Sequence, residues 1–305
     1  MTRSAISFAA ALSLALVGAA PAFAQGTPDF SKVEIKTTQL APDFWTLEGQ
    51  GGTISVLAGP DAILLVDSQF APLTDKLVAA IRKISDKPIR FLVDTHLHGD
   101  HVGGNENFAR LGATIFARDQ LRYRLEHPNP AADGTPGKPA AAAALPIVTY
   151  NASLSIHVDG EDVRLLPVVA GHTDGDTVVS FPRHDLLAVG DIFRSVGYPF
   201  ADLANGGSLA GLLEGLSEIV DRSGPATRII PGHGPLVDRN AVLAQRDLIL
   251  AVRAKVLKLV EQGKTLDEAI AAHPTAEFDA HVPGATPSTA DRFVTWVYKE
   301  VVANR

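Results

Sequence analysis

The stretch "THLHGDHVGG", residues 95–104, places three histidines and an aspartate within six positions, from His96 to His101. Histidine is scarce in the rest of the chain, which has 10 in 305 residues. An apolar run, "PIRFLVDT" at residues 88–95, leads directly into the stretch, and paired glycines end it. A strand followed by a ligand-rich loop is therefore expected here, and imidazole and carboxylate groups at this density indicate a metal site.

Alternation along an extended backbone would point His96 and His98 the same way. A tight turn through Gly99 would then bring Asp100 and His101 round from the other side. The result is two adjacent ligand pairs, and both are incomplete because a catalytic zinc ion usually takes three protein ligands. Glycine lets the backbone approach such a crowded site, which is the role expected of Gly99, Gly103 and Gly104.

Three later segments repeat one pattern, in which an apolar strand is followed by a glycine and then by a ligand-type residue. They place His172 in "VVAGHTDGDT", Asp191 in "LLAVGDIF" and His233 in "RIIPGHGP". Strand ends at one edge of a sheet converge, so these loops are expected to meet the first stretch.

Two complete ligand sets follow from this convergence. The first set is His96, His98 and His172; the second is Asp100, His101 and His233. Asp191 is expected to bridge the two ions through its two oxygens. Two ions so placed share a hydroxide, which forms because the pKa of bound water falls to about 7, and which attacks a carbonyl. Asp100 is also a candidate for relaying a proton.

Composition narrows the chemistry. There is no cysteine, which excludes thiolate zinc sites, iron–sulfur clusters, disulfides and cysteine nucleophiles. Imidazole and carboxylate ligands suit zinc, and also iron or manganese. The formal net charge of −7 argues against nucleic acid or an anionic membrane surface as a partner. The remaining histidines, His127, His157, His184, His273 and His281, lack a strand-end context and are expected at the surface or in packing.

Residues 1–24 have the layout of a secretory signal peptide. Arg3 precedes an apolar stretch that ends in Ala22-Phe23-Ala24, a small-x-small cleavage pattern. A membrane anchor is the alternative, but the apolar part is short and lacks a positive flank. The mature chain is expected to begin near Gln25 and to be periplasmic or secreted, without membrane attachment.

The remaining pattern predicts strands first, then a helix at 72–87, a strand, short helices at 105–112 and 118–126, and more strands. A helix at 208–220, a strand, and helices at 238–261, 265–272 and 288–303 complete the order. This order favours two packed sheets with helices outside, in one α/β domain covering 26–305.

Two loops are candidates for bordering the metals. Residues 128–146 are rich in Pro, Ala and Gly and form either a surface insertion or a lid. In the loop 191–208, Phe193, Tyr198 and Phe200 are expected to wall an apolar pocket. Arg194 is a candidate for meeting a substrate carboxylate, and Tyr198 for donating to a developing oxyanion as a catalytic residue. The alternative is a connecting loop whose aromatic side chains pack inward.

The ordered set H-x-H-x-D-H, G-H-T, G-D and P-G-H-G resembles the metallo-β-lactamase superfamily. These motifs fall at residues 96–101, 171–173, 190–191 and 231–234. "LLVDS" resembles the family's first motif, with Asp67 as the residue that orients the site. The resemblance implies a four-layer αβ/βα sandwich with two zinc ions between the sheet edges.

Branches of the family differ in the residues that bind the metals. Its di-iron flavoproteins have a glutamate where His98 stands, which favours zinc here. One β-lactamase subclass uses a cysteine ligand, and another generally lacks an aspartate like Asp191. Export also argues against an intracellular glutathione substrate.

The hypothesis is therefore an exported hydrolase with two Zn2+ per chain that cleaves a small ester, lactone, thioester or amide. The alternatives are a metallo-β-lactamase, a non-catalytic periplasmic metal- or ligand-binding module, and a mono-iron oxidoreductase such as a persulfide dioxygenase.

Overall fold

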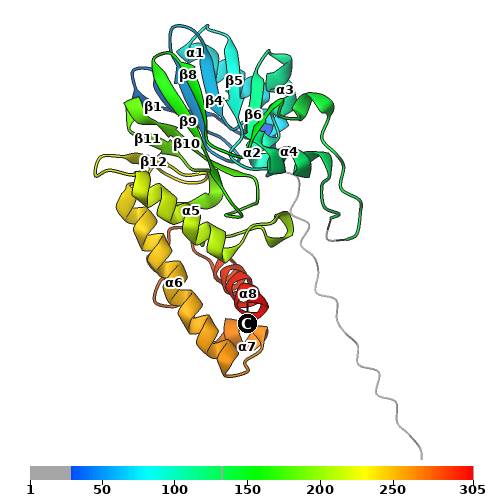
Figure 1. Cartoon of the computed structure of the whole chain (residues 1–305), viewed down its shortest axis with the longest axis vertical. Coiled ribbons are helices and arrows are strands. Elements are labelled where there is room, and N and C mark those ends of the chain that lie inside the picture. Colours follow the sequence, from blue (N-terminus) through cyan, green and yellow to red (C-terminus); the bar gives the residue numbers. More distant parts are fainter. Residues whose placement is uncertain (1–28, 132, 305) are drawn as a thin grey trace, which may run out of the picture.

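The apolar runs of the sequence pair into two sheets in a computed structural model that describes residues 29–131 and 133–304 (Figure 1). The first sheet has seven strands in the order β1 to β7, antiparallel from β1 to β4 and parallel from β4 to β7. Its strands are β1 (Lys36–Ala41), β2 (Phe44–Glu48), β3 (Ile54–Ala58), β4 (Ile63–Val66), β5 (Ile89–Val93), β6 (Thr114–Arg118) and β7 (Val148–Tyr150).

The second sheet has five strands in the order β12-β11-β10-β9-β8. Its neighbours are antiparallel except β11 and β12, which run parallel. The strands are β8 (Leu154–Val158), β9 (Glu161–Val168), β10 (Asp176–Phe181), β11 (Leu186–Ala188) and β12 (Arg228–Ile230). Because β9, β11 and β12 therefore point the same way, their carboxyl ends lie at one edge of the sheet.

Alternating side chains show that both sheets are buried on both faces. In β4, Leu64 and Val66 join an apolar cluster between the two sheets, whereas Ile63 and Leu65 join a second cluster beneath helices. In β10, Val179 faces the first sheet. A strand that is apolar on both faces is expected only where further layers cover the sheets.

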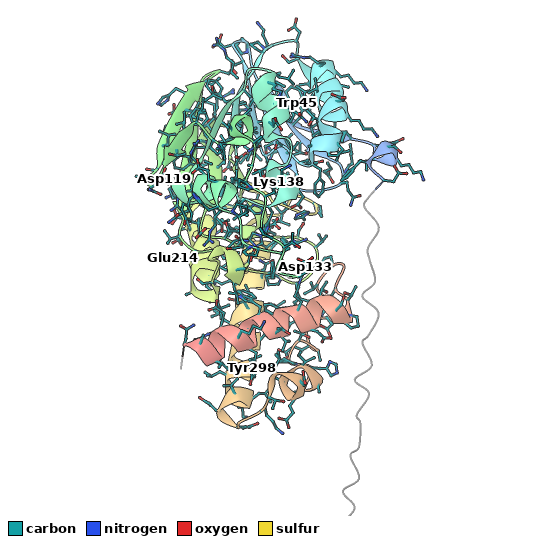
Figure 2. All side chains as sticks on the ribbon, turned by 90° about the vertical axis from the view of Figure 1, so that its right-hand side faces the viewer. Trp45, Asp119, Asp133, Lys138, Glu214 and Tyr298 are labelled. Carbon is teal, nitrogen blue, oxygen red and sulfur yellow. The ribbon has the colours of Figure 1, made fainter. Side chains whose placement is uncertain are left out.

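The covering layers are helical, which completes a four-layer αβ/βα sandwich in a single domain and confirms the expected fold (Figure 1). Helices α1 and α3 pack on the outer face of the first sheet, and α5 and α6 on that of the second. Figure 2 shows α8 crossing the lower part of the molecule, where Tyr298 is labelled. The helices are α1 (Thr74–Ile84), α2 (Gly99–Val102), α3 (Asn105–Arg110), α4 (Asp119–Glu126), α5 (Leu209–Arg222), α6 (Arg239–Glu261), α7 (Leu266–Ala271) and α8 (Pro287–Ala303).

Most predicted elements are present within a few residues of their expected ends. The Ser208 hydroxyl caps α5 by accepting a hydrogen bond from the Gly211 amide at 3.0 Å. The short strand β7 was not predicted, and the turn expected at Gly99 is a single helical turn, α2. Within the loop 128–146, the described residues form no α-helix or strand, only the 3-10 turn Ala142–Ala144.

The expected signal peptide, residues 1–24, lies outside the described residues. Across 29–131 and 133–304, no helix combines the length and the hydropathy needed to cross a bilayer.

Candidate metal centre

The four ligand-bearing segments meet at one edge of the sandwich because the strands before them end there. His96 follows β5, His172 follows β9, Asp191 follows β11 and His233 follows β12. Backbone hydrogen bonds join these ends, from Thr177 N to Thr95 O at 2.8 Å and from Gly232 N to Gly190 O at 2.8 Å. The predicted convergence of loops is therefore present. We call the seven side chains of these segments the candidate metal centre: His96, His98, Asp100, His101, His172, Asp191 and His233.

The first expected ligand set is assembled. One donor atom from each of His96, His98 and His172 lies within 4.8 Å of the other two. The His172 Nε2 atom is 3.0 Å from His98 Nδ1. The His96 ring lies edge-on to both, with ring centroids at 4.9 and 4.8 Å. Three imidazole nitrogens that converge in this way suit a tetrahedral ion with one open position.

The second expected set, Asp100, His101 and His233, is assembled as well. The His233 Nε2 atom is 3.2 Å from Asp100 Oδ2 and 3.4 Å from His101 Nε2. The helical turn α2 carries both Asp100 and His101 and begins directly after His98.

Asp191 lies between the two sets. Its Oδ1 atom is 3.4 Å from His233 Nε2 and 3.6 Å from His101 Nε2, and its Oδ2 atom is 3.8 Å from His172 Nε2. One oxygen thus faces the second set and the other faces the first. This is the arrangement that a carboxylate bridging two cations requires.

Four of the histidines are fixed by a contact on the ring nitrogen that faces away from the centre. The Asp67 carboxylate is 2.7 Å from His101 Nδ1, which confirms the contact expected of Asp67. The outer nitrogens of the other three lie near Thr95 Oγ1, the Phe200 carbonyl oxygen and Asp202 Oδ2, for His96, His172 and His98 respectively. Such contacts fix both the ring orientation and the tautomer of a metal ligand.

Sequence reasoning missed Thr95, Asp202 and the Phe200 carbonyl in these roles. Thr95 directly precedes His96, so the sequence could have indicated a contact between them. Asp202 is 104 residues from His98, and no local pattern connects the two.

Glycines make room for the centre at Gly232, which the P-G-H-G motif includes, and at Gly52, which the sequence analysis did not single out. A Cβ at Gly52 would lie 2.2 Å from the His101 ring, and one at Gly232 would lie 2.0 Å from Asp191 Oδ1. A Cβ at Gly103 or Gly104 would lie 2.4 or 2.5 Å, respectively, from a backbone oxygen, so the close approach expected at these two glycines is present. Gly99 has nothing within 4 Å, so the close approach expected there is wrong.

The histidines of the centre differ in the direction of their pKa shifts. Burial lowers the pKa of His96 well below its usual range and lowers the pKa of His172 to about 4, so both are neutral and suited to bind a cation. Burial also lowers the pKa of His233, but its contacts with Asp100 and Asp191 outweigh that effect and raise the pKa to about 9. In Asp191, burial is likewise outweighed by the surrounding histidines, which hold the pKa well below its usual range.

The donor set fits a pair of divalent cations. The His96 Nε2 and Asp191 Oδ1 atoms are buried and have no hydrogen-bond partner in the described part of the protein. Buried polar atoms without a hydrogen-bond partner destabilise the folded protein unless a ligand binds to them. Both belong to a third group of converging donors, His96, His101 and Asp191, which links the two sets.

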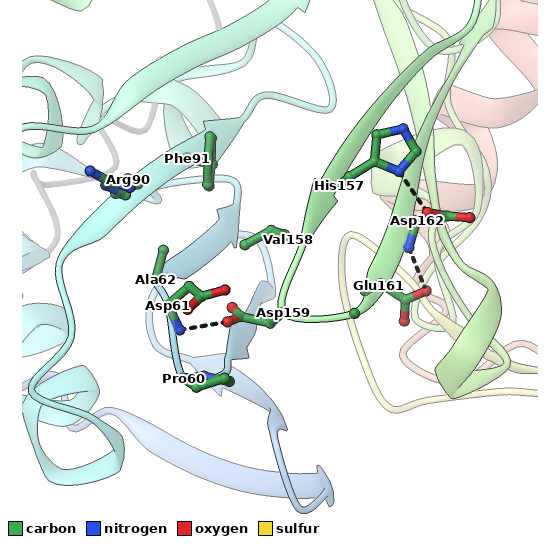
Figure 3. Close-up of a pocket in the computed structure, with 11 residues that line it drawn as sticks. Pro60, Asp61, Ala62, Arg90, Phe91, His157, Val158, Asp159, Glu161 and Asp162 are labelled. Carbon is green, nitrogen blue, oxygen red and sulfur yellow. Dashed lines mark hydrogen bonds and ion pairs between the residues drawn. The ribbon is translucent and has the colours of Figure 1, made fainter.

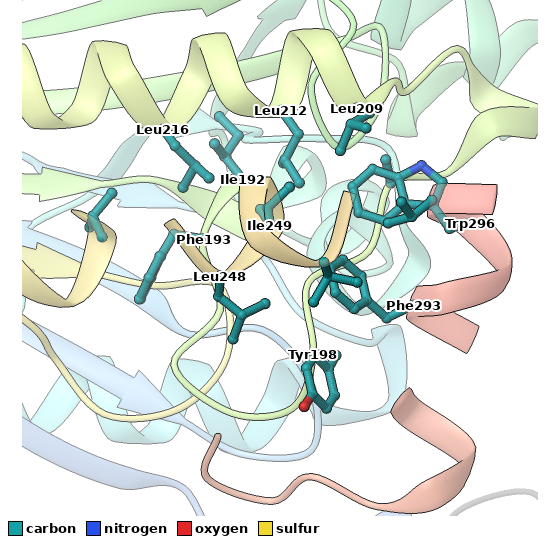
Figure 4. Close-up of a cluster of buried hydrophobic side chains, with 14 of the residues drawn as sticks. Ile192, Phe193, Tyr198, Leu209, Leu212, Leu216, Leu248, Ile249, Phe293 and Trp296 are labelled. Carbon is teal, nitrogen blue, oxygen red and sulfur yellow. The ribbon is translucent and has the colours of Figure 1, made fainter. Parts of the chain in front are cut away.

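The structure corrects the roles expected for Tyr198 and Phe193. Tyr198 is 1% exposed, donates from its hydroxyl to Asp279 at 2.5 Å and stacks on Phe293 (Figure 4). It cannot donate to an oxyanion, because its side chain belongs to the core beneath α8. Phe193 is buried in the same core. The alternative of inward-packed aromatic side chains therefore holds for these two.

Arg194 does lie beside the centre, with Nη1 at 3.8 Å from Asp191 Oδ2. The five remaining histidines contribute to none of the three donor groups found among the described residues. His184, for example, is buried between Glu161 and Asp43.

Two hollows differ in their relation to the centre. A cleft of about 400 Å3 is lined by Leu97 and Asp202, which flank and contact His98, and by part of the loop 128–146. A larger cleft of about 710 Å3 lies at the opposite end of the sandwich, around the turns at Pro60 and Asp159 (Figure 3). None of the seven residues lines either cleft, but the smaller one reaches the neighbourhood of the centre through Leu97 and Asp202.

Comparison with known proteins agrees with this geometry. The sequence profile described as "Metallo-beta-lactamase superfamily" matches residues 47–252. The metallo-beta-lactamase type 2 of Bacillus cereus is 24% identical over 197 residues, which cover 64% of this chain and 71% of that protein.

Two solved structures share the fold. The metallo-beta-lactamase from Pontibacter korlensis superposes with a TM-score of 0.58 at 19% identity, covering 70% of this chain and 99% of that one. The stereoselective inverting sec-alkylsulfatase from Pseudomonas sp. superposes with a TM-score of 0.62 at 17% identity, covering 87% of this chain. This chain spans 50% of that sulfatase.

Proposed function

This chain belongs to the metallo-beta-lactamase superfamily, whose members are metal-dependent hydrolases, and from that premise we propose that it is an exported dinuclear zinc hydrolase. Its substrate is a small ester, lactone, thioester or amide. The observation that carries the proposal is the position of Asp191, whose two oxygens face two three-residue donor sets.

In this proposal His96, His98 and His172 hold one ion, Asp100, His101 and His233 hold the other, and Asp191 contacts both. Zinc is proposed because imidazole and carboxylate donors suit it, and because His98 stands where the family's di-iron flavoproteins have a glutamate. When bound, a pair of such ions supplies an activated water at neutral pH and polarises the carbonyl to be attacked.

The protein's own residues position the reacting groups. Asp100 keeps contact with solvent, with a side chain 25% exposed, whereas the Asp191 side chain is 5% exposed. Burial raises the pKa of Asp100, but His233 and His101 outweigh that effect and lower it, so the carboxylate is ionised. Asp100 is therefore the group that can accept a proton and pass it to the leaving group.

The cleft beside His98 supports a small acyl substrate. Its wall combines apolar residues such as Leu97, Leu125 and Pro128 with polar and charged ones, including Lys138. A hollow of about 400 Å3 accommodates a compound of modest size.

The comparisons favour a second candidate, an alkyl sulfate ester. The sec-alkylsulfatase superposes on 87% of this chain, whereas the β-lactamase from Pontibacter korlensis superposes on 70%. β-Lactam hydrolysis remains the third candidate, since the Bacillus cereus relative is named for it.

A hydrolysis panel on the zinc-loaded protein tests the proposal. It includes an aryl ester, an acyl-homoserine lactone, a glutathione thioester, a chromogenic cephalosporin and a secondary alkyl sulfate. We expect turnover of at least one of the first three, and loss of that turnover in His98→Ala and Asp191→Ala. His157→Ala is the matched control, because His157 is an exposed histidine that contacts Asp162 far from the centre (Figure 3).

Full turnover in His98→Ala and Asp191→Ala would contradict the mechanism. Zinc binding without turnover of any panel member would instead indicate a non-catalytic binding module. Oxygen consumption together with one bound iron would indicate an oxidoreductase.

Export is proposed from the pattern of residues 1–24. The mass of the protein recovered from the periplasmic fraction should correspond to a chain that begins near Gln25. Recovery of the uncleaved chain in the membrane fraction would refute this part of the proposal.

A further inference from the structure

Two arginines from distant parts of the chain lie beside the candidate metal centre. Arg194 follows Asp191 in the loop after β11, and its Nη1 atom is 3.8 Å from Asp191 Oδ2. Arg292 is on α8, and its guanidinium lies 4.9 Å from the centroid of the Phe200 ring. That ring is 5.8 Å from the His172 ring, and the Phe200 carbonyl accepts from His172 Nδ1 at 2.7 Å. Arg194 thus lies next to the proposed ligand Asp191, and Arg292 is separated from the proposed ligand His172 by Phe200.

The charges of these two arginines are poorly balanced by the protein. Among the described residues, no carboxylate lies within 4.0 Å of Arg292. Arg194 is near Asp191 alone, and three histidines already contact that carboxylate. The Nε atom of Arg194 is buried and has no hydrogen-bond acceptor among residues 29–131 and 133–304. Arg292 is exposed, so both guanidinium groups have donors to offer to an anion that arrives from solvent.

Other arginines close to this edge of the fold are engaged by the protein itself. Arg124 makes a two-nitrogen contact with the Asp174 carboxylate, at 2.7 Å from Nη2 and 3.2 Å from Nε. Arg118 is buried and donates to the Val168 carbonyl at 2.9 Å. The Arg118 Nε atom is, like that of Arg194, buried without a hydrogen-bond partner among the described residues, so Arg124 is the clearest example of an arginine that serves only the fold.

Packing holds Arg292 over the loop. The next residue, Phe293, stacks on Tyr198 at a centroid distance of 5.2 Å, and Tyr198 in turn donates to Asp279 (Figure 4). The Gly197 amide donates to the Pro283 carbonyl at 2.7 Å. The loop 193–200 and α8 are therefore one packed unit, and stacking on Phe200 orients the Arg292 fork before any ligand binds.

The electrostatics agree with this arrangement. Burial lowers the pKa of Arg292, and the like charge of Arg194 lowers it further, while Asp191 opposes the change. Two like charges that sense each other are stabilised by an anion bound between them.

We propose that Arg194 and Arg292 form an anion subsite that binds the carboxylate or sulfate group of the substrate. This rests on the proposed hydrolase function and narrows it to substrates that carry a negative charge near the scissile bond. Arginine suits the role because its planar fork matches either anion with two parallel hydrogen bonds. Arg194 lies within the residues 47–252 that match the family profile, whereas Arg292 lies beyond them, on the C-terminal helix α8.

Two measurements on the zinc-loaded protein test the subsite. The first is kcat/KM for two 4-nitrophenyl esters of equal chain length, the glutarate monoester with a terminal carboxylate and the neutral valerate. The second is calorimetric binding of glutarate and of propane-1-sulfonate, which needs no turnover and separates the carboxylate from the sulfate source. The variants are Arg292→Gln and Arg292→Lys. Arg90→Gln is the control, since Arg90 is an exposed arginine at the opposite end of the sandwich (Figure 3).

We expect Arg292→Gln to weaken binding of at least one anion about ten-fold or more, through loss of a charge-assisted hydrogen bond. The glutarate ester should lose a similar factor, mainly through KM, while the valerate ester changes about two-fold at most. Arg292→Lys should recover part of the loss, and Arg90→Gln should show none.

Unchanged binding of both anions by Arg292→Gln would overturn the subsite, even if the esters are hydrolysed. If no ester is hydrolysed but anion binding falls in this variant alone, the subsite stands and the proposed hydrolase function fails.

Discussion

At the scale of single residues, the centre depends on contacts that orient the histidine rings. Asp202 is the clearest case, because its Oδ2 atom lies 2.9 Å from His98 Nε2 and leaves His98 Nδ1 facing His172. Loss of such a partner typically weakens metal binding ten- to hundred-fold. We predict a loss of about ten-fold or more in zinc affinity for Asp202→Asn, measured by competition with a chromogenic chelator.

Asparagine is a suitable replacement because it can still accept the hydrogen bonds from Ala204 and Asn205 that Asp202 receives. Asp162→Asn is the matched control, since Asp162 contacts the exposed His157. Equal zinc affinity in the Asp202 and Asp162 variants would show that Asp202 does not position a ligand.

His233 predicts the pH dependence of metal binding. Its pKa in the metal-free protein is raised to about 9, so at pH 7 it carries a proton that a cation must displace. Zinc affinity should therefore rise about ten-fold per pH unit between pH 7 and 9 for this proton alone, and then level off. The measurement is calorimetry across that range, and a flat profile would contradict the assignment of His233.

The same shift has a consequence for the metal-free fold. A histidine whose pKa rises from 6.5 to about 9 on folding stabilises the protein fully below pH 6.5. That contribution is lost as the pH rises through about 9. Denaturant unfolding of the metal-free protein should show the corresponding loss, and His233→Gln should not.

The positions of the seven ligand-type residues were predictable because they fall in four segments that each follow an apolar strand and contain glycine. The side chains around them were not. Asp202 and Arg292 reach the site from distant segments, and Tyr198 turns inward because α8 offers it Phe293 and Asp279. A loop sequence does not show which of its aromatic side chains will be covered by a later helix.

At the scale of elements, the turns that carry ligands tolerate little added volume. A Cβ at Gly52 would lie 2.2 Å from the His101 ring, whereas one at Gly99 would meet nothing within 4 Å. Gly52→Ala should lower the free energy of unfolding by about 1–3 kcal/mol, by the usual cost of overpacking, and should weaken zinc binding as His101 shifts. Gly99→Ala should leave both quantities near the wild-type values, as measured by denaturant unfolding and zinc titration.

Equal effects of the two substitutions would show that the close backbone approach to His101 is unimportant. The comparison is informative because both glycines are near the centre: Gly52 packs against the His101 ring, and Gly99 lies between His98 and Asp100 in the sequence.

Elements with a clear period were predicted, and short elements were not. The long helix α6 and the strands of both sheets carry alternating or helical apolar patterns that burial then uses. Strand β7 has three residues and helix α2 has four, which is too few to establish a period. The conformation of such short elements depends on their tertiary surroundings. In α2, the Val102 amide donates to the His98 carbonyl and closes the helical turn.

At the scale of the whole molecule, the centre lies where both sheets and the helical part meet, beside the apolar cluster that the two sheets share. The two sheets contribute ligands from opposite sides, and the loop after β11 ties them to the helical part. A cation bound only by the folded protein stabilises it, by about 2.7 kcal/mol at a concentration 100-fold above Kd. We predict that chelation lowers the Tm by about 5 °C or more.

Asp191→Asn should reduce this zinc-dependent shift, and His157→Ala should keep it, in differential scanning calorimetry with and without chelator. An identical Tm for the loaded and stripped wild-type protein would argue against a metal that is part of the folded structure.

The order of strands and helices was sufficient to predict two packed sheets, and the resemblance of the motifs supplied the four layers. The role of the C-terminal helices was not predictable. Their apolar faces indicated packing, yet only the structure shows that α8 packs on the loop 193–200 and brings Arg292 beside the centre.

The central claim is a pair of ions bridged by Asp191, and anomalous diffraction from crystals of the zinc-loaded protein, recorded at the zinc edge, tests it most directly. Two peaks are predicted, one among His96, His98 and His172 and one among Asp100, His101 and His233, with an Asp191 oxygen beside each. One peak alone, no peak, or peaks away from these residues would contradict it.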